Sequence, residues 1–303
     1  MRAKLTEALI PRAKAEDFVF LTGDLGFMAL EPLRDAAKER FINAGIAEQA
    51  MVSVAAGLAE AGLRPWVYSI APFLYARAFE QIRNDVCMHN LPVCFVGNGG
   101  GYAYGAMGPT HHAIEDYGTL LGLPNLSVYV PAFGNDVVHA VARALAAAKP
   151  TYLRLGRDET PEDFPLPPYA PWRRLLSGGG ATLLIVGPLA GGLLGAARSM
   201  PEAQRPTLWV LSELPIDPKG IPSTFIDDFQ RSGHLVVVEE HVAHGGAGAA
   251  LAHALLSAHA VPRQFTHRGA GGHPVGRTGS QSYHRQQCGL DVPSVLRLSS
   301  NAS

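Results

Sequence analysis

The most informative stretch of this chain is Gly45-Ile46-Ala47-Glu48-Gln49. It follows Arg40-Phe41-Ile42-Asn43, which is typical of a short buried strand, and it precedes a run of small residues over 50–61 that predicts a helix. A carboxylate at such a strand-to-helix turn has no obvious packing role, so it needs a partner. One interpretation is a glutamate that caps a helix N-terminus. The other is a functional carboxylate.

Composition sets the broad class of the chain. The sequence has 303 residues, 47% of them hydrophobic and 17% charged, which allows a substantial core in one large or two ordinary domains. The net charge of −1 gives no electrostatic reason to expect nucleic acid or an anionic membrane as a partner. Three cysteines without CxxC spacing suit a reducing cytoplasm. We see no signal-type segment and no apolar run long enough to span a membrane.

Strand-like and helix-like runs alternate along the chain. In the first half, apolar runs predict strands at 18–21, 41–42, 64–68, 92–96, 126–130 and 151–155. The helices expected between them lie at about 46–62, 72–89, 112–121 and 134–148. A second series predicts strands at 181–186, 208–211 and 234–239, with helices near 188–199, 223–232 and 245–259. This alternation predicts two α/β domains with mostly parallel sheets.

A proline-rich segment separates the two series. Residues 161–171 contain five prolines in eleven residues, which cannot continue a helix or a central strand. The sequence therefore predicts a first domain at 1–160, a linker at 161–176 and a second domain at 177–303.

A glycine-rich loop follows the strand expected at 92–96. Four glycines in the five positions 97–101 let the backbone approach a ligand closely, and the loop ends in Gly108-Pro109-Thr110-His111-His112. Ligands of open α/β sheets bind beyond the carboxyl ends of strands, so the location suits a site. The loop lacks both GxGxxG and GxxxxGK[ST], so it is not a typical phosphate cradle. A lone histidine in such a loop can equally be a surface residue.

Zinc is the metal to consider near this loop. The candidate ligands are His111, His112, Glu115 and Asp116. The HExxH spacing is absent and adjacent histidines point in different directions, so no metal site is predicted.

Two of these segments resemble motifs of the transketolase family. The stretch at 45–49 is similar to the family segment (G)-I/V-x-E-(Q/H), and the stretch at 108–112 is similar to the GPTH(Q/H) motif. The resemblance implies that Glu48 hydrogen-bonds the aminopyrimidine of thiamine diphosphate (ThDP) and drives formation of the reactive ylide. It also implies that His111 lines the substrate channel and contacts the oxygen of the attacked carbon.

A third segment, 68–82, resembles the family segment YSTFLxRAxDQ. The resemblance implies that Phe73, with Phe79 as a second choice, stacks on the pyrimidine of the coenzyme. The alternative for both rings is a place in the core. Arg77 matches an arginine of the deoxyxylulose-phosphate synthase branch. Asp24 matches the aspartate of the family's ADL turn, which implies a position near the cofactor.

Two further positions bear on the substrate. The strand ending at 153–157 resembles one whose arginine binds substrate phosphate, which implies that role for Arg157; the alternative is a salt bridge beside the linker. Met107 stands where transketolases have an aspartate that reads donor hydroxyls, and a thioether cannot accept those hydrogen bonds. Transketolases also have a histidine that helps to hold the substrate phosphate, and the resemblance implies that this chain has glycine at that position, near Gly99. We therefore expect a specialised sugar or secondary-metabolite substrate.

The resemblance covers essentially the whole chain, as a ThDP pyrimidine-binding domain followed by a transketolase C-terminal domain. The GDG…N motif for diphosphate and metal is absent, because Leu25 follows Asp24. This implies a separate N-terminal subunit that holds the diphosphate and Mg²⁺ (or Ca²⁺). The chain is then the C-terminal subunit of a split, α₂β₂ transketolase that passes a two-carbon ketol unit from a ketose-type donor to an aldehyde.

Three alternatives remain at this point. The first is the β subunit of a 2-oxoacid dehydrogenase, which usually carries a PQHSQ-type segment in place of 108–112. The second is a carboligase like deoxyxylulose-phosphate synthase, which would release CO₂ from pyruvate. The third is a non-catalytic regulatory subunit, against which the presence of Glu48 and His111 argues.

Overall fold

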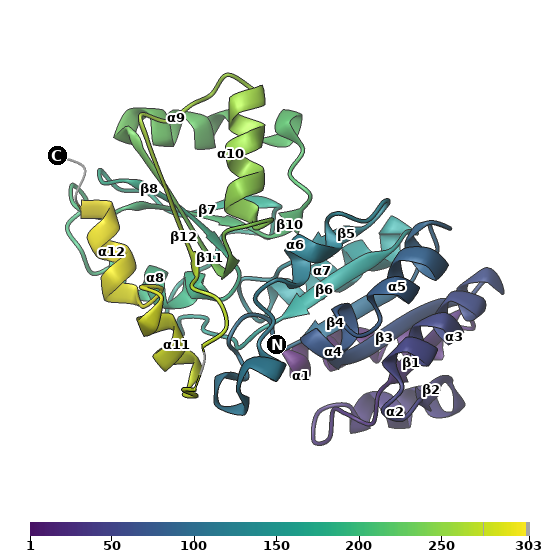
Figure 1. Cartoon of the computed structure of the whole chain (residues 1–303). Helices are drawn as coiled ribbons and strands as arrows, with labels where there is room; N and C mark the ends of the chain where they lie inside the picture. The colour runs from purple at the N-terminus through teal and green to yellow at the C-terminus, as the bar shows by residue number, and fades with distance from the viewer. Residues whose placement is uncertain (275, 301–303) are drawn as a thin grey trace.

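The computed structural model describes residues 1–274 and 276–300, which form two sheets side by side (Figure 1). The seven-stranded sheet has the order β10-β5-β6-β4-β3-β1-β2, and the five-stranded sheet has the order β12-β11-β8-β9-β7. The paired strands of the described residues are parallel except for β10 with β5 and β7 with β9. The predicted α/β class with mostly parallel sheets is confirmed.

The first sheet takes nearly all its strands from the N-terminal half of the chain. Its strands are β1 (Phe18–Thr22), β2 (Phe41–Asn43), β3 (Arg64–Ile70), β4 (Cys94–Asn98), β5 (Ser127–Tyr129), β6 (Thr151–Leu155) and β10 (Glu213–Leu214). The helices of this half are α1 (Arg2–Leu9), α2 (Glu31–Ala37), α3 (Glu48–Glu60), α4 (Ala71–Tyr75), α5 (Phe79–Gln81), a π-helix (Ile82–Cys87), α6 (Asp116–Leu120) and α7 (Asp136–Ala147). Short 3₁₀ turns lie at Arg12–Lys14, Lys38–Arg40, Gly105–Met107 and Pro109–His111.

The second sheet is formed by the C-terminal half. Its strands are β7 (Trp172–Leu176), β8 (Thr182–Val186), β9 (Thr207–Leu211), β11 (His234–Val242) and β12 (Gln264–Ala270). Its helices are α8 (Leu189–Ala197), α9 (Ser223–Ser232), α10 (Ala247–Ser257), α11 (Gln281–Gln287) and α12 (Val292–Ser300), with a 3₁₀ turn at Pro218–Gly220. No helix within the described ranges is both long and apolar enough to cross a membrane.

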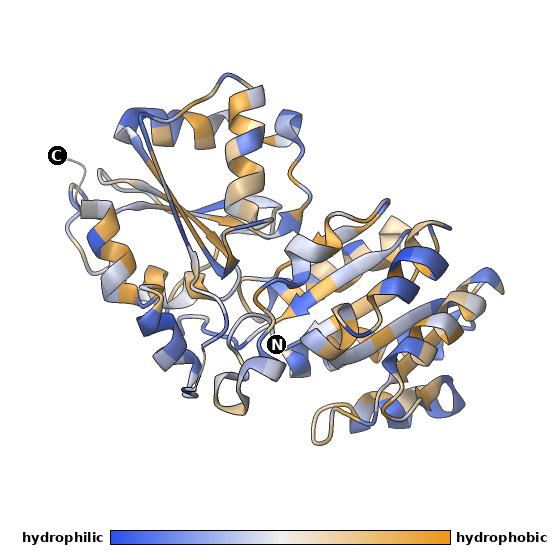
Figure 2. Ribbon diagram, viewed as in Figure 1, coloured by the Kyte–Doolittle hydropathy of each residue, from blue (hydrophilic) through white to orange (hydrophobic). Residues whose placement is uncertain are grey.

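Helices cover both faces of each sheet, which explains why the central strands are largely apolar. On one face of the first sheet, α1 and α7 contribute Leu5 and Val141 to a buried cluster. On the other face, α3 and α4 contribute Val52 and Leu74 to a second cluster, which continues into the second sheet and includes Phe225 of α9. Figure 2 shows apolar residues along the central strands and on the helix sides that face them, whereas the edge strand β12 is largely hydrophilic. The continuous core holds the two sheets together.

The expected linker at 161–176 is wrong in its last five residues. The prolines do prevent regular structure up to Pro171, but Trp172–Leu176 forms β7 and pairs antiparallel with β9. The strand forms because its alternate residues Arg173 and Leu175 are buried, whereas Arg174 is exposed. It is an edge strand, so the adjoining proline is tolerated.

Several other elements differ from the prediction. The helix expected at 72–89 is interrupted and ends in a π-helix. The helix expected at 112–121 begins only at Asp116, because the backbone of Ala113 pairs with Gly101 in an antiparallel bridge. The helices α2, α11 and α12 and the strands β10 and β12 were not predicted. Strand β10 follows β9 of the second sheet along the chain but pairs with β5 of the first sheet.

Candidate active site

Four neighbouring strands of the first sheet end at the same edge. The last residues of β1, β3, β4 and β6 are Thr22, Ile70, Asn98 and Leu155. The segments that follow these strands contain most of the residues predicted to bind coenzyme or substrate. Since parallel strands bring their carboxyl ends together, the topology places these segments where an α/β protein binds its ligand.

The turn between β2 and α3 is shaped by the side chain of Asn43. Its Oδ1 accepts hydrogen bonds from the backbone N–H groups of Asp24 and Gly45, each at 3.0 Å. Its Nδ2 donates to Asp24 Oδ1 at 2.9 Å. Gly45 has a φ of +69°, which glycine adopts without strain. This turn delivers Glu48 as the first residue of α3.

Glu48 is buried among exposed neighbours. The residue is 2% exposed, whereas Ile46 is 79% exposed. Arg77 Nη1 donates to Glu48 Oε2 at 2.6 Å, and Ser69 Oγ donates to Oε1 at the long distance of 3.4 Å. A buried carboxylate requires such partners. One oxygen is thus firmly held and the other is held weakly.

Two rings complete the surroundings of Glu48. The guanidinium carbon of Arg77 lies 4.5 Å from the centroid of the Phe73 ring, and the Phe73 and His111 ring centroids are 5.0 Å apart in an edge-to-face arrangement. The structure therefore brings Glu48, Phe73, Arg77 and His111 together. We call these four residues the Glu48 cluster.

The remaining predicted residues lie outside this cluster. Phe79, the first residue of α5, is partly buried and packs against the hydrophobic core. Asp24 is exposed and bonded to Asn43, and Met107 is 64% exposed at the end of a 3₁₀ turn. Arg157 lines a separate cavity at the ends of β4 and β6.

The four residues weighed as zinc ligands each have different partners. His111 Nδ1 contacts Thr110 Oγ1, and His112 Nε2 faces the Gly105 carbonyl. Asp116 accepts from Arg154, and Glu115 accepts from Tyr75. In the described part of the chain, no group of three or more His, Cys, Asp or Glu side chains is placed to hold a metal ion.

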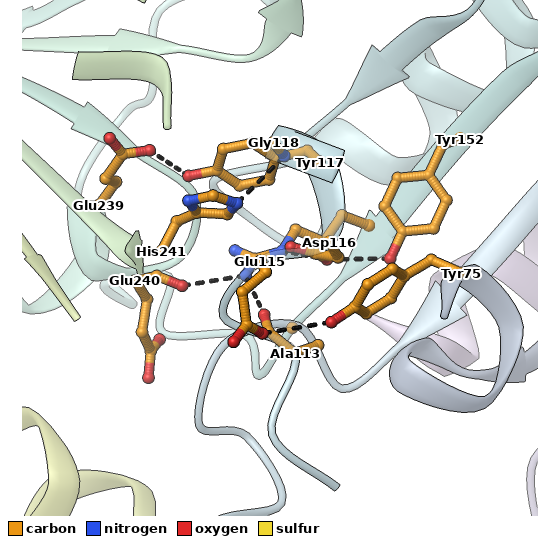
Figure 3. Close-up of polar contacts among 12 residues, drawn as sticks. Tyr75, Ala113, Glu115, Asp116, Tyr117, Gly118, Tyr152, Glu239, Glu240 and His241 are labelled. Atoms are coloured by element: carbon orange, nitrogen blue, oxygen red, sulfur yellow. Dashed lines mark hydrogen bonds and ion pairs between the residues drawn. The ribbon is translucent and has the colours of Figure 1, made fainter. Parts of the chain in front are cut away.

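A buried polar network ties the loop that carries His111 to the second sheet (Figure 3). Arg154 of β6 donates to Asp116 Oδ2 at 2.8 Å, to the Ala113 carbonyl at 2.8 Å and to the Glu240 carbonyl at 3.0 Å. Tyr117 donates to Glu239 of β11. We call these five residues and their bonds the interdomain network; its members are Asp116, Tyr117, Arg154, Glu239 and Glu240. These bonds hold the segment that follows His111 against β6 and β11.

The network and its neighbours perturb two titratable groups. Burial alone would raise the pKa of Glu239, but hydrogen bonds from His267, Tyr117 and the Gly248 N–H outweigh it, so the pKa lies below its ordinary value. The pKa of His112 is lowered by burial, and nearby His284 and His273 lower it further. The fold therefore favours the ionised carboxylate of Glu239 and the neutral imidazole of His112.

The sequence did contain signals for some residues that were missed. Arg154 is a charge within an otherwise apolar strand, which indicates a buried ion pair. Ser69 is a polar residue near the carboxyl end of β3. Tyr104 and Arg2, which line the cavity beside Arg157, gave no comparable signal.

Comparisons with known proteins agree with this arrangement. Residues 2–162 match the family description "Transketolase, pyrimidine binding domain". One subunit of the apulose-4-phosphate transketolase of Actinobacillus succinogenes is 31% identical over 266 residues, 86% of this chain and 84% of the relative. The 1-deoxy-D-xylulose-5-phosphate synthase 2 of Geobacter sulfurreducens is 34% identical over 262 residues, 84% of this chain but 41% of the relative.

A solved structure extends the similarity to both sheets. It is described as "Split gene transketolase, inactive beta4 tetramer", and it has a TM-score of 0.83 and 30% identity over 99% of this chain and 97% of that chain. The pyrimidine-binding match and the synthase relatives imply ThDP as the coenzyme. The chain therefore belongs to the transketolase family and matches the C-terminal half of a split, two-subunit transketolase.

Proposed function

We propose that this chain supplies the pyrimidine side of a ThDP site and, with an N-terminal partner subunit, transfers a two-carbon ketol unit from a ketose-type donor to an aldehyde acceptor. The observation that carries the proposal is the Glu48 cluster. A buried carboxylate, an aromatic face and a histidine meet at the carboxyl ends of parallel strands. The similarity to one subunit of an apulose-4-phosphate transketolase supports the reaction class.

The residues of the cluster fit the pyrimidine of the coenzyme. The Arg77 guanidinium is planar, lies over Phe73 and donates to Glu48, so a flat group that took its place would meet both residues. Phe73 offers an aromatic face for stacking. We propose that Phe79 supports Phe73 from the core and is the second choice for stacking on the pyrimidine, and that Asp24 lies near the coenzyme at the rim of the site. When bound, ThDP supplies a nucleophilic carbon and an electron sink.

The protein groups then have distinct roles. Glu48 exchanges a proton with the aminopyrimidine, protected from bulk water by its burial. His111 donates a hydrogen bond to a substrate oxygen and moves a proton at that atom. Arg157, exposed at the rim of its cavity, binds a substrate phosphate. The apolar Met107 leaves donor hydroxyls at that position unread, which favours a specialised sugar or secondary-metabolite substrate.

We further propose that the partner carries the GDG…N motif and holds the diphosphate with Mg²⁺ (or Ca²⁺), in an α₂β₂ assembly. Exposed apolar side chains lie on α3, on the turn before it and on the segment that follows β1. Ile46 is 79% exposed, Val54 on the outer side of α3 is 51% exposed, and Phe27 and Met28 are 72% and 97% exposed. Large exposed apolar side chains on neighbouring segments favour an interface here.

The test is Glu48→Gln in the reconstituted pair. Co-purification from the source cell followed by mass spectrometry identifies the partner, and a ketose and aldehyde screen finds the substrates. Because general acid–base groups contribute about 10²- to 10⁴-fold, turnover should fall by at least about 100-fold while the pair still assembles. Glu7→Gln, a surface change on α1, is the matched control. Unchanged turnover of Glu48→Gln would eliminate the mechanism.

A carboligase like deoxyxylulose-phosphate synthase is the second candidate. The 34% identity to a synthase and the synthase-type Arg77 favour it. The two reactions differ in one product, so release of CO₂ from pyruvate by the reconstituted pair would select the synthase-like reaction over ketol transfer.

A further inference from the structure

A cavity of about 440 Å³ lies at the carboxyl ends of β4 and β6, beside the Glu48 cluster. The residues that matter in its lining are Arg2, Asn98, Gly99, Tyr104, Arg157 and Asp158. A volume of this size holds a small molecule. The proposed function uses only Arg157 of this set.

The charges of the cavity favour an anion. Arg2 and Arg157 both line it, and within the described residues neither forms an ion pair. The one carboxylate of the lining, Asp158, accepts hydrogen bonds from the backbone N–H groups of Gly134 and Thr160 at 3.0 and 3.1 Å. The positive charge of the two guanidinium groups therefore remains available, and guanidinium suits a phosphate.

Tyr104 is fixed in the wall of this cavity by its neighbours. Its ring lies directly on Gly99, where an added Cβ would overlap the ring atoms. Gly99 has a φ of +85°, so glycine serves both the backbone and the close approach. Asn98 Nδ2 donates to Tyr104 Oη at 2.6 Å. The position of the hydroxyl is thus set from two sides.

The hydroxyl proton of Tyr104 remains to be donated. The phenol oxygen accepts from Asn98, and in the described part of the chain no protein group accepts its proton. The Tyr104 and His111 ring centroids are 6.2 Å apart. Tyr104 therefore stands between the histidine proposed to act on the substrate and the cavity with the two arginines.

We infer that Tyr104 is a specificity-determining residue that selects a phosphate monoester of a polyhydroxylated substrate, by donating its hydroxyl proton to a phosphate oxygen. This inference rests on the proposed function, in which the substrate extends from His111 toward Arg157. Loss of one hydrogen bond to a charged acceptor should weaken binding by about tenfold. An unphosphorylated polyol has no such acceptor and loses nothing.

Calorimetric titration of the full chain with glycerol 3-phosphate, and separately with glycerol, tests the inference. Tyr104→Phe should bind glycerol 3-phosphate about tenfold more weakly than the unchanged protein. Gly99→Ala should weaken it as well, because the added methyl group displaces the ring. Tyr283→Phe, a tyrosine of α11 outside the cavity, is the matched control and should behave like the unchanged protein.

Three results would overturn the inference: no binding of glycerol 3-phosphate by the unchanged chain, equal affinity of Tyr104→Phe, or an equal loss for glycerol. In the reconstituted pair, Tyr104→Phe should raise KM for a phosphorylated ketose with little change in kcat and leave an unphosphorylated ketose unaffected. The titration needs neither coenzyme nor partner. Phosphate-ester binding without any transfer activity would therefore count against the proposed function alone.

Discussion

The Glu48 cluster and the interdomain network are both organised around an arginine–carboxylate pair, but the two pairs differ in solvent access. The side chains of Arg77 and Glu48 are 43% and 1% exposed, whereas those of Arg154 and Asp116 are 4% and 0% exposed. Arg154 has three hydrogen-bond acceptors, and Arg77 has one among the described residues. The network is buried and its charges are paired, although Asp116 Oδ1 has no hydrogen-bond partner among the described residues, whereas the cluster is left open on one side.

This contrast in exposure separates a structural role from a binding role. A buried network whose charges are paired stabilises one arrangement of the chain. A site that receives a ligand must keep donors and acceptors available for that ligand. The half-exposed Arg77 and the weakly held Oε1 of Glu48 meet this requirement.

The largest effect is expected for Arg154→Met in the interdomain network. Removing one partner of a buried ion pair leaves an uncompensated charge, so the free energy of unfolding should fall by about 3–5 kcal/mol, measured by urea denaturation. The double variant Asp116→Asn with Arg154→Met should recover part of this loss, because no buried charge remains. A loss below about 1 kcal/mol for the single variant would show that the hydrogen bond from Tyr152 Oη to Asp116 Oδ2, at 2.9 Å, is enough to compensate the buried carboxylate.

The second prediction concerns the pH dependence of stability, through His112 at the end of the glycine-rich loop. The folded pKa of His112 lies below its ordinary value of 6.5, because of burial and of the neighbouring His284, His273 and His111. The unfolded chain therefore takes up a proton more readily. The contribution of His112 to stability is complete above about pH 6.5 and is lost as the pH falls below that value.

The measurement is the free energy of unfolding between about pH 7.5 and 5.5, on either side of the ordinary histidine pKa, compared with that of His112→Gln. The amide of glutamine does not titrate and can still donate to the Gly105 carbonyl, which His112 Nε2 contacts at 3.1 Å. The variant should lose less stability on acidification than the unchanged protein. Identical pH dependence would remove His112 as the source.

The smallest effect on stability is expected for Arg77→Met, the same chemical change as in the network but in the Glu48 cluster. Glu48 is buried and loses its firm partner, but because Arg77 is nearly half exposed, solvent screens the pair, so the free energy of unfolding should fall by less than it does for Arg154→Met. Urea denaturation alongside Arg154→Met gives a matched pair of arginines. A loss as large as that of Arg154→Met would mean that the cluster is part of the structural interior.

The order of strands and helices was predictable wherever a buried strand is apolar throughout. Strands β1 and β8 come closest to this pattern, since each is buried at every position and has four apolar residues in five. Strand β12 was missed because Gln264–Ala270 is a half-exposed edge strand that mixes polar and apolar residues, so no apolar run marks it. Strand β10 has two residues and depends entirely on its partner in the other sheet.

The candidate site was predictable only as far as local motifs extend. The segments around Glu48 and His111 have family resemblance, so both positions were expected from the sequence. The contact between Arg77 and Glu48 and the pairing of Arg154 with Asp116 join residues 29 and 38 positions apart, which no local spacing reveals. Tyr104 gave no signal because its proposed role depends on the close approach of its ring to Gly99.

Strand β10 limits any attempt to cut the chain at its proline-rich segment. Glu213 and Leu214 cover the outer side of β5 by pairing with Tyr129 and Val128. A fragment that stops near residue 160 would lack this cover and would present bare backbone donors and acceptors along β5. Such an edge recruits strands from other molecules. The N-terminal portion on its own should therefore aggregate, and the two portions need to be expressed as one polypeptide.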